Sequence, residues 1–239
     1  MMGMPISVLA RGAQAGSDAA DSAVQDLYAE LGDIDRLFSP YKPDSVVSLL
    51  MRGEVDWSDA GFDVLEVCER CAAAREMTGG LFDADLPDGG WDPSGLVKGW
   101  AVERAGERLR AVADVDWCLN AGGDVLVISP SAEAFTIGIQ DPRDPGRVVA
   151  SLDRTWGAVA TSGTAARGEH LYDPRTGRPV RGRWLSVSVS GPSLEYADIF
   201  ATAAFVAGDD WPAILLPGFE GLGILADGNM FSTAGWGTS

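Results

Sequence analysis

The 239-residue sequence contains a single histidine, His170, so any histidine chemistry in this chain must pass through that one side chain. Basic residues are also scarce: 18 Lys and Arg stand against 35 Asp and Glu, which gives a formal net charge of −17. Nucleic acids and anionic membrane surfaces are bound through clustered cations. Neither is therefore an expected partner.

Cysteine is rare as well, with Cys68, Cys71 and Cys118 as the only three. The close pair reads CERC, and a CxxC motif can be a redox site or half of a zinc site. This pair falls inside a helical pattern, no second CxxC follows, and His170 is far away in the sequence. We expect reduced thiols with a structural role.

Long apolar runs are absent too, and the first residues, MMGMPISVLARG, lack the basic start and apolar core of a secretory signal. These absences predict a cytoplasmic protein without a membrane segment. The composition, 46% hydrophobic and 22% charged, is typical of a globular protein that buries a full core. No linker interrupts the chain, so one domain is expected over residues 1–239.

Three helical patterns dominate the first half, and each follows a serine able to cap a helix: Ser17, Ser58 and Ser94. From residue 115 short β-rich runs alternate with Gly, Pro and Asp turns, until a last helix follows Ser193. The strands are expected at residues 5–10, 116–121, 125–128, 135–140, 147–152, 156–160 and 184–190, with 214–215 and 223–225 closing the sheet. This order predicts an α+β fold, a mainly antiparallel sheet with packed helices.

Two glycine-containing segments offer backbone to a ligand. DPSGLVKGWA, residues 92–101, leads into a helix N-terminus from which Lys98 projects, an arrangement that favours a phosphate but also occurs in many proteins that bind none. NAGGD, residues 120–124, lets another group approach the backbone, and Asp124 can accept hydrogen bonds from a ribose or an adenine. The alternative for NAGGD is a plain tight hairpin or β-bulge.

Two further segments offer oxygen atoms. ATSG, residues 160–163, presents two hydroxyls and a backbone N–H at a strand end, although it is equally compatible with a turn. In YADIFAT, Asp198 and Thr202 are spaced i, i+4 on one helix. That spacing places a carboxylate and a hydroxyl one turn apart, as two ligands of a hard cation require, or as an exposed side-chain hydrogen bond.

His170 begins the segment HLYDPRTG, in which Asp173-Pro174 and Thr176-Gly177 predict a turn. The residues from His170 to Tyr172 are expected to end a strand and to hold the imidazole at a surface. Its pKa near neutrality suits proton transfer there. A lone histidine in this place can also merely hydrogen-bond the turn.

The order of these motifs resembles that of the FAD:protein FMN transferase family, also called the ApbE family. HxxDPxTG followed by ADxxxT is its most specific part, and the opening MGMP and the loop FSPYKPDS match as well. The resemblance runs from about Met2 into the last helix, and it implies the T-fold-like α+β architecture of that family.

Members of this family use FAD and a divalent cation, usually Mg²⁺, to transfer FMN to a Ser or Thr of an acceptor flavoprotein, releasing AMP. The resemblance implies that Asp198 and Thr202 hold Mg²⁺, with a backbone carbonyl from residues 94–97, and that His170 accepts the proton of the acceptor hydroxyl. It assigns the flavin and nucleotide to Met2, Tyr41, Asp92, Lys98, Gly123, Asp124, Ser162, Gly163 and Asp173. Two alternatives stay open, an Mg²⁺-dependent FAD pyrophosphatase and a non-catalytic FAD-binding protein.

Overall fold

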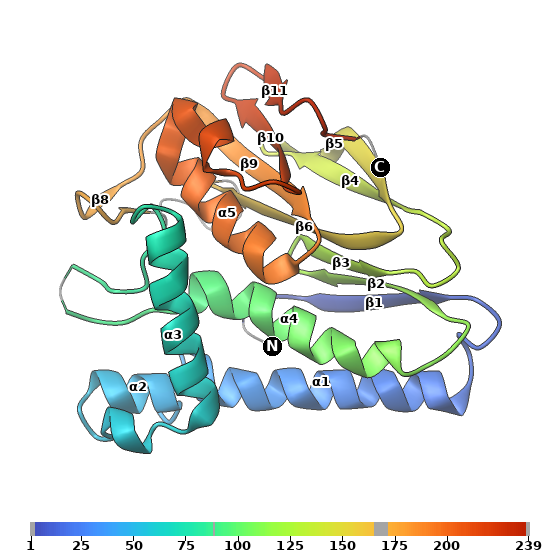
Figure 1. Ribbon diagram of the computed structural model, residues 1–239, viewed down its shortest axis with the longest axis horizontal. Coiled ribbons are helices and arrows are strands. Elements are labelled where there is room, and N and C mark those ends of the chain that lie inside the picture. Colours follow the sequence, from blue (N-terminus) through green and yellow to red (C-terminus); the bar gives the residue numbers. More distant parts are fainter. Residues whose placement is uncertain (1–2, 88, 165–171, 238–239) are drawn as a thin grey trace.

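The computed structural model describes residues 3–87, 89–164 and 172–237, and it has the mixed helix and antiparallel-sheet architecture that the sequence predicts (Figure 1). Its helices are α1 (Asp18–Phe38), α2 (Val46–Met51), α3 (Phe62–Met77), α4 (Ser94–Arg110) and α5 (Leu194–Ala207), with 3₁₀ turns η1 (Trp57–Asp59) and η2 (Gly208–Ile214). Its strands are β1 (Ile6–Arg11), β2 (Asp116–Ala121), β3 (Asp124–Ile128), β4 (Phe135–Asp141), β5 (Asp144–Arg154), β6 (Trp156–Gly163), β7 (Tyr172–Asp173), β8 (Arg178–Pro179), β9 (Trp184–Gly191), β10 (Glu220–Leu225) and β11 (Met230–Ser232).

The main sheet has seven strands in the order β1-β2-β3-β6-β9-β10-β11, and all of its neighbours pair antiparallel. Strands β4 and β5 leave this sheet and form a separate two-stranded hairpin, and β7 and β8 form a second one. The long crossover between β3 and β6 is therefore filled by the β4–β5 hairpin (Figure 1).

The two faces of the sheet are covered by different elements, and β3 shows the division most clearly. All five of its residues are buried. Leu126 and Ile128 belong to the large core shared with the helices, whereas Val125 and Val127 belong to a smaller core shared with β4 and β5. Because side chains alternate along a strand, residues an even number of positions from Leu126 point toward the helices.

Several helix ends lie where the sequence places them. The Ser17 hydroxyl accepts the N–H of Ala20 at 3.2 Å and caps α1, and α5 has the expected bounds after Ser193. At the end of α3, Gly79 and Gly80 adopt positive φ angles of 60° and 79°. Glycine enters that region without the steric cost of a Cβ, so the pair ends the helix as predicted.

Other predicted ends were wrong. Ser58 lies inside η1, and α3 begins after Gly61 instead, which makes no side-chain cap. Ser94 is the first residue of α4 rather than its cap, and its N–H donates to the Asp92 carboxylate at 2.9 Å. Residues 214–215 do not form a strand, since Ile214 ends η2. Helix α2 was not expected, because six residues carry too little periodicity to stand out.

The three cysteines lie on one helix and one strand. Cys68 and Cys71 are on α3, Cys118 is on β2, and all three are free. Burial raises the pKa of the Cys71 thiol, which keeps it protonated and unreactive. As to the bilayer, none of the helices within residues 3–87, 89–164 and 172–237 has the length and hydrophobicity needed to cross one.

Candidate active site

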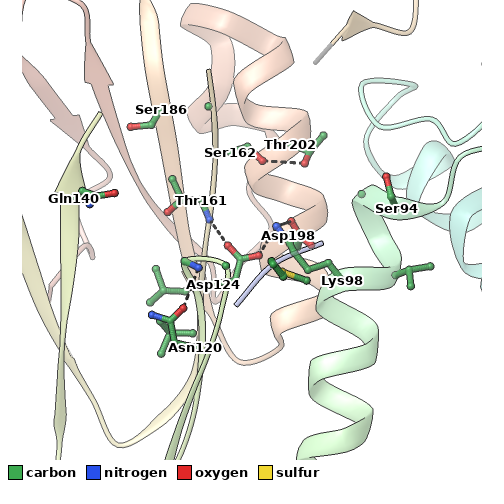
Figure 2. Close-up of a pocket in the computed structure, with 18 of the residues that line it drawn as sticks. Ser94, Lys98, Asn120, Asp124, Gln140, Thr161, Ser162, Ser186, Asp198 and Thr202 are labelled. Carbon is green, nitrogen blue, oxygen red and sulfur yellow. Dashed lines mark hydrogen bonds and ion pairs between the residues drawn. The ribbon is translucent and has the colours of Figure 1, made fainter. Parts of the chain in front are cut away.

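A cavity of about 1120 Å³ opens where the N-terminal end of α4, the start of β3, the end of β6 and the hairpin strand β4 come together (Figure 2). Its lining includes most of the residues that the sequence singled out: Tyr41, Asp92, Lys98, Gly123, Asp124, Ser162, Gly163, Asp198 and Thr202. These residues come from five separate stretches of the sequence, and only the fold brings them to one place.

Strand alternation explains why two of these side chains reach the helices. Asp124 lies two residues before Leu126 on β3, and Ser162 lies two residues after Ala160 on β6. Leu126 and Ala160 both belong to the core that the helices share. Asp124 and Ser162 therefore point toward α4 and α5, where Lys98 and Thr202 meet them.

Lys98 lies between two carboxylates that come from different elements. Its Nζ is 2.6 Å from Oδ2 of Asp124 and 3.2 Å from Oδ1 of Asp198 (Figure 2). Both aspartates are 1% exposed, and the second carboxylate oxygen of Asp124 accepts the backbone N–H of Thr161 at 3.0 Å. Helix α4, helix α5 and strand β3 are thus joined by a single ammonium group.

Burial and charge act against each other in this group. Burial raises the pKa of Asp198 to about 7, and the nearby Asp124 adds to the rise, while Lys98 opposes it. For Lys98, burial alone would lower the pKa, but Asp198 and Asp124 outweigh it and hold the pKa above its ordinary value. When both carboxylates are ionised, they exceed the one ammonium by a single negative charge, and a further cation would stabilise that state.

Asp198 and Thr202 lie one turn apart on α5, as predicted, and both line the cavity. The Thr202 hydroxyl is 3.0 Å from that of Ser162. Oδ2 of Asp198 is buried and has no hydrogen-bond partner among the described residues. A buried, unpartnered carboxylate oxygen beside hydroxyl oxygens suits Mg²⁺, which prefers oxygen ligands and keeps several waters. No cluster of three or more His, Cys, Asp or Glu suited to a metal occurs in this described part of the chain.

NAGGD forms the tight turn between β2 and β3, at the edge of the cavity. Gly122 and Gly123 have positive φ angles of 63° and 104°, and the Asn120 side chain accepts the Gly123 N–H at 3.0 Å. A Cβ on Gly122 would lie 2.7 Å from the sulfur of Met4. The hairpin alternative is therefore correct for the backbone, and the same turn also delivers Asp124 to Lys98.

The remaining predicted site residues are less closely tied to this group. Tyr41 lines the cavity but is 83% exposed. Asp173 is not among the lining residues, and both of its carboxylate oxygens bind Arg175 at 2.9 Å. Met2 and His170 lie outside the described residues, so their predicted roles remain predictions.

One wall of the cavity was missed in the sequence. Strand β4 contributes Thr136, Gly138 and Gln140 to the lining, and Gln140 extends into the cavity from the side opposite to Lys98 (Figure 2). The strand itself was predicted, and its strictly alternating burial matches a half-buried strand. No local sequence pattern indicates that β4 leaves the main sheet.

Comparison with known proteins identifies the family. The family model described as ApbE family matches residues 86–220, more than half of the chain, and the chain belongs to that family. The FAD:protein FMN transferase of Rhodobacter capsulatus is 36% identical over 169 residues, which cover 66% of this chain and 32% of that protein. The FAD:protein FMN transferase of Vibrio cholerae is 28% identical over 167 residues, 62% of this chain and 50% of that protein. The chain thus matches between about a third and a half of the length of these relatives.

Solved structures of the same family have the same fold. The ApbE protein of Thermotoga maritima superposes with a TM-score of 0.85 at 22% identity, covering 98% of this chain and 95% of that one. The flavin transferase ApbE of Vibrio cholerae superposes with a TM-score of 0.77 at 19% identity, covering 97% of this chain and 98% of that one. These likenesses confirm the predicted fold class.

Proposed function

We propose that this protein is an Mg²⁺-dependent flavin transferase that moves FMN from FAD to a Ser or Thr hydroxyl of an acceptor flavoprotein and releases AMP. The observation that carries the proposal is the buried Asp124–Lys98–Asp198 group at the cavity wall, in which Oδ2 of Asp198 lacks a hydrogen-bond partner among the described residues. The names of the relatives, FAD:protein FMN transferase, support the substrate.

Asp198 and Thr202 would hold the cation, with the backbone of residues 94–97 close by. Mg²⁺ bound there would neutralise charge on the pyrophosphate of FAD during transfer. Lys98 adds a second positive charge, and the N-terminal end of α4, at Ser94, directs its helix dipole toward the cavity that Ser94 lines. An otherwise acidic cavity is thereby made suitable for a diphosphate.

The reaction joins the acceptor oxygen to the phosphorus of the FMN half and breaks the bond between that phosphorus and the bridging oxygen, which leaves with AMP. The proton of the acceptor hydroxyl goes to His170 in this proposal, in keeping with the family motif HxxDPxTG. Asp173, two residues before Arg175, orders the turn that follows, because the Arg175 side chain and backbone both bind it. Water in place of the acceptor would give FMN and AMP.

The experiment that tests the function follows FAD, FMN and AMP by chromatography, with and without Mg²⁺ and with a Ser- or Thr-containing acceptor peptide. Mg²⁺-dependent AMP release with flavin covalently attached to the peptide is the expected result. AMP with free FMN would establish the pyrophosphatase instead. FAD that stays intact in every mixture would leave a non-catalytic FAD-binding protein.

His170 is tested by His170→Ala under the same conditions. Loss of a general base slows such a transfer by about two to four orders of magnitude. If the transfer rate of a normally folded His170→Ala variant falls by well below tenfold, His170 is not the general base and only orders its turn.

A further inference from the structure

Helices α4 and α5 cross closely at Gly99. A Cβ placed on Gly99 would lie 2.7 Å from the carbonyl oxygen of Leu194 and 2.9 Å from Cα of Glu195. The two helix backbones are therefore in contact at this point, immediately beside the contact between Lys98 and Asp198. Whatever sets the register of this crossing also sets where Asp198 points.

Glu103 makes a second polar contact between α4 and the start of α5. Its Oε2 accepts the hydroxyl of Ser193 at 2.8 Å and the backbone N–H of Glu195 at 3.0 Å. The Ser193 hydroxyl in turn accepts the N–H of Tyr196 at 3.3 Å. A single carboxylate thus orients the N-cap hydroxyl of α5 and satisfies one of the free N–H groups at its start.

The spacing of the two contacts couples them. Lys98 and Glu103 are five residues apart on α4, and Ser193 and Asp198 are five residues apart on α5. Five residues correspond to about 7.5 Å of helix rise. The Lys98–Asp198 contact and the Glu103 contacts are thus separated by that rise along the crossing, and the helix backbones touch at Gly99, beside Lys98. A shift or rotation of α5 relative to α4 would break at least one of these contacts.

We infer that Glu103 is a positioning residue: it holds the start of α5 against α4 in the register that presents Asp198 and Thr202 to the cation. It does not line the cavity, so it acts only through the two helices. This inference rests on the proposed function, since it takes α5 to carry the cation ligands. Removal of residues that orient metal ligands weakens metal affinity by about 10- to 100-fold.

The test compares Glu103→Ala, Glu103→Gln and Arg104→Gln. Glutamine keeps an oxygen that can accept both hydrogen bonds, so it should preserve the register. Arg104 is the matched control, because it ties the same helix to Glu30 at 3.0 Å and to Asp63 at 2.8 Å, contacts that lie outside the cavity lining. A purely structural loss would affect Glu103→Ala and Arg104→Gln alike.

The dissociation constant for Mg²⁺ is measured by titration calorimetry in the absence of FAD, so that no turnover occurs. The Mg²⁺ concentration for half-maximal AMP release is measured separately. We expect both values to rise on the order of tenfold in Glu103→Ala, and to stay near those of the starting protein in Glu103→Gln and Arg104→Gln. A folded Glu103→Ala variant with unchanged Mg²⁺ affinity would overturn the inference, as would a Glu103→Gln variant as impaired as Glu103→Ala.

If Glu103→Ala does not fold, Ser193→Ala replaces it, because this change removes the hydroxyl contact and leaves the Glu195 N–H bond. An increase of about threefold in the Mg²⁺ dissociation constant is then expected, the equivalent of part of one hydrogen bond, and no increase would overturn the inference. If the protein without any substitution neither binds Mg²⁺ nor releases AMP, the proposed function itself is refuted. This result differs from those that overturn only the role of Glu103.

Discussion

The two faces of the central sheet differ in how they contribute to the cavity. On the helix face, buried charged and polar groups from α4, α5, β3 and β6 meet at distances of 2.6 to 3.2 Å around Lys98 and Thr202. On the hairpin face, the wall is a half-buried strand, β4, over a small apolar core, and its partner β5 is largely exposed. The helix face is built to hold charge in fixed positions, whereas the hairpin face shapes the space in front of it.

The largest effect is expected from Asp198→Asn, on the helix face. The change keeps the shape of the side chain but removes the charge that a cation needs, so AMP release should fall roughly 10³-fold, the scale of losing an electrostatic stabiliser at a reacting centre. Chromatography of AMP gives the rate, and circular dichroism checks the fold. Near-normal turnover would show that Asp198 is no cation ligand.

The next largest effect is expected from Gly99→Ala, because a Cβ there would overlap the backbone of α5. The helices must move apart, and a displacement near 1 Å at a reacting centre can cost about 10²-fold in rate. Gly32→Ala, on α1, is the matched control, since nothing lies within 4 Å of its added Cβ. It should raise the free energy of unfolding by about 0.4–1 kcal/mol, measured by urea unfolding, with activity unchanged.

If Gly99→Ala kept full activity while destabilising the protein, the close crossing would matter for packing alone. Equal loss of activity in Gly32→Ala would show that the assay responds to any helix substitution rather than to the α4–α5 register.

A smaller effect is expected from Lys98→Met, which removes the ammonium from between Asp124 and Asp198. Loss of a charged hydrogen-bond donor to the pyrophosphate is worth about 1.5–3 kcal/mol, so KM for FAD should rise roughly 10- to 100-fold. Arg11→Met is the control, because Arg11 also pairs with a buried aspartate, Asp116, at 3.2 Å, and neither residue lines the cavity. Steady-state kinetics separates KM from kcat.

An unchanged KM for FAD in Lys98→Met would mean that Lys98 serves only the two aspartates. In that case thermal unfolding should still report a marked loss, because a buried carboxylate is left without its counter-ion.

The smallest effect is expected from Gln140→Ala, on the hairpin face. Gln140 reaches the cavity from the wall opposite to Lys98 (Figure 2), and it carries no charge. Loss of one neutral hydrogen bond, about 0.5–1.5 kcal/mol, should raise KM for FAD by roughly two- to tenfold and leave kcat unchanged. If Gln140→Ala lowered kcat as much as a substitution on the helix face does, the two faces would not differ in their contribution to catalysis.

Local patterns were sufficient for much of the fold. The cap at Ser17, the α5 range, the glycine end of α3 and the alternating burial over the seven residues of β4 all depend on neighbours in the sequence. Pattern reasoning failed at the start of α4, where the Asp92 carboxylate, and not the Ser94 hydroxyl, accepts a backbone N–H. It also failed for α2, which is too short for periodicity to reveal.

The site divides in the same way. Asp198 and Thr202 are spaced one helical turn apart, which the sequence shows directly. The glycines of NAGGD likewise predict the turn that they form. That Lys98 would bind both Asp124 and Asp198 was not predictable, because these residues are separated by 26 and 100 positions and meet only when β3, α4 and α5 pack together.

Capping, alternation and turn chemistry act over short range, so the four longer helices, most strands and the motif order that resembles the ApbE family are all predictable from the sequence. Long-range packing brings β4 and β5 out of the sheet to form a cavity wall, and it brings Glu103 and Gly99 of α4 against α5. Such contacts follow from the close packing of elements far apart in the chain, and no local pattern encodes which of them will touch.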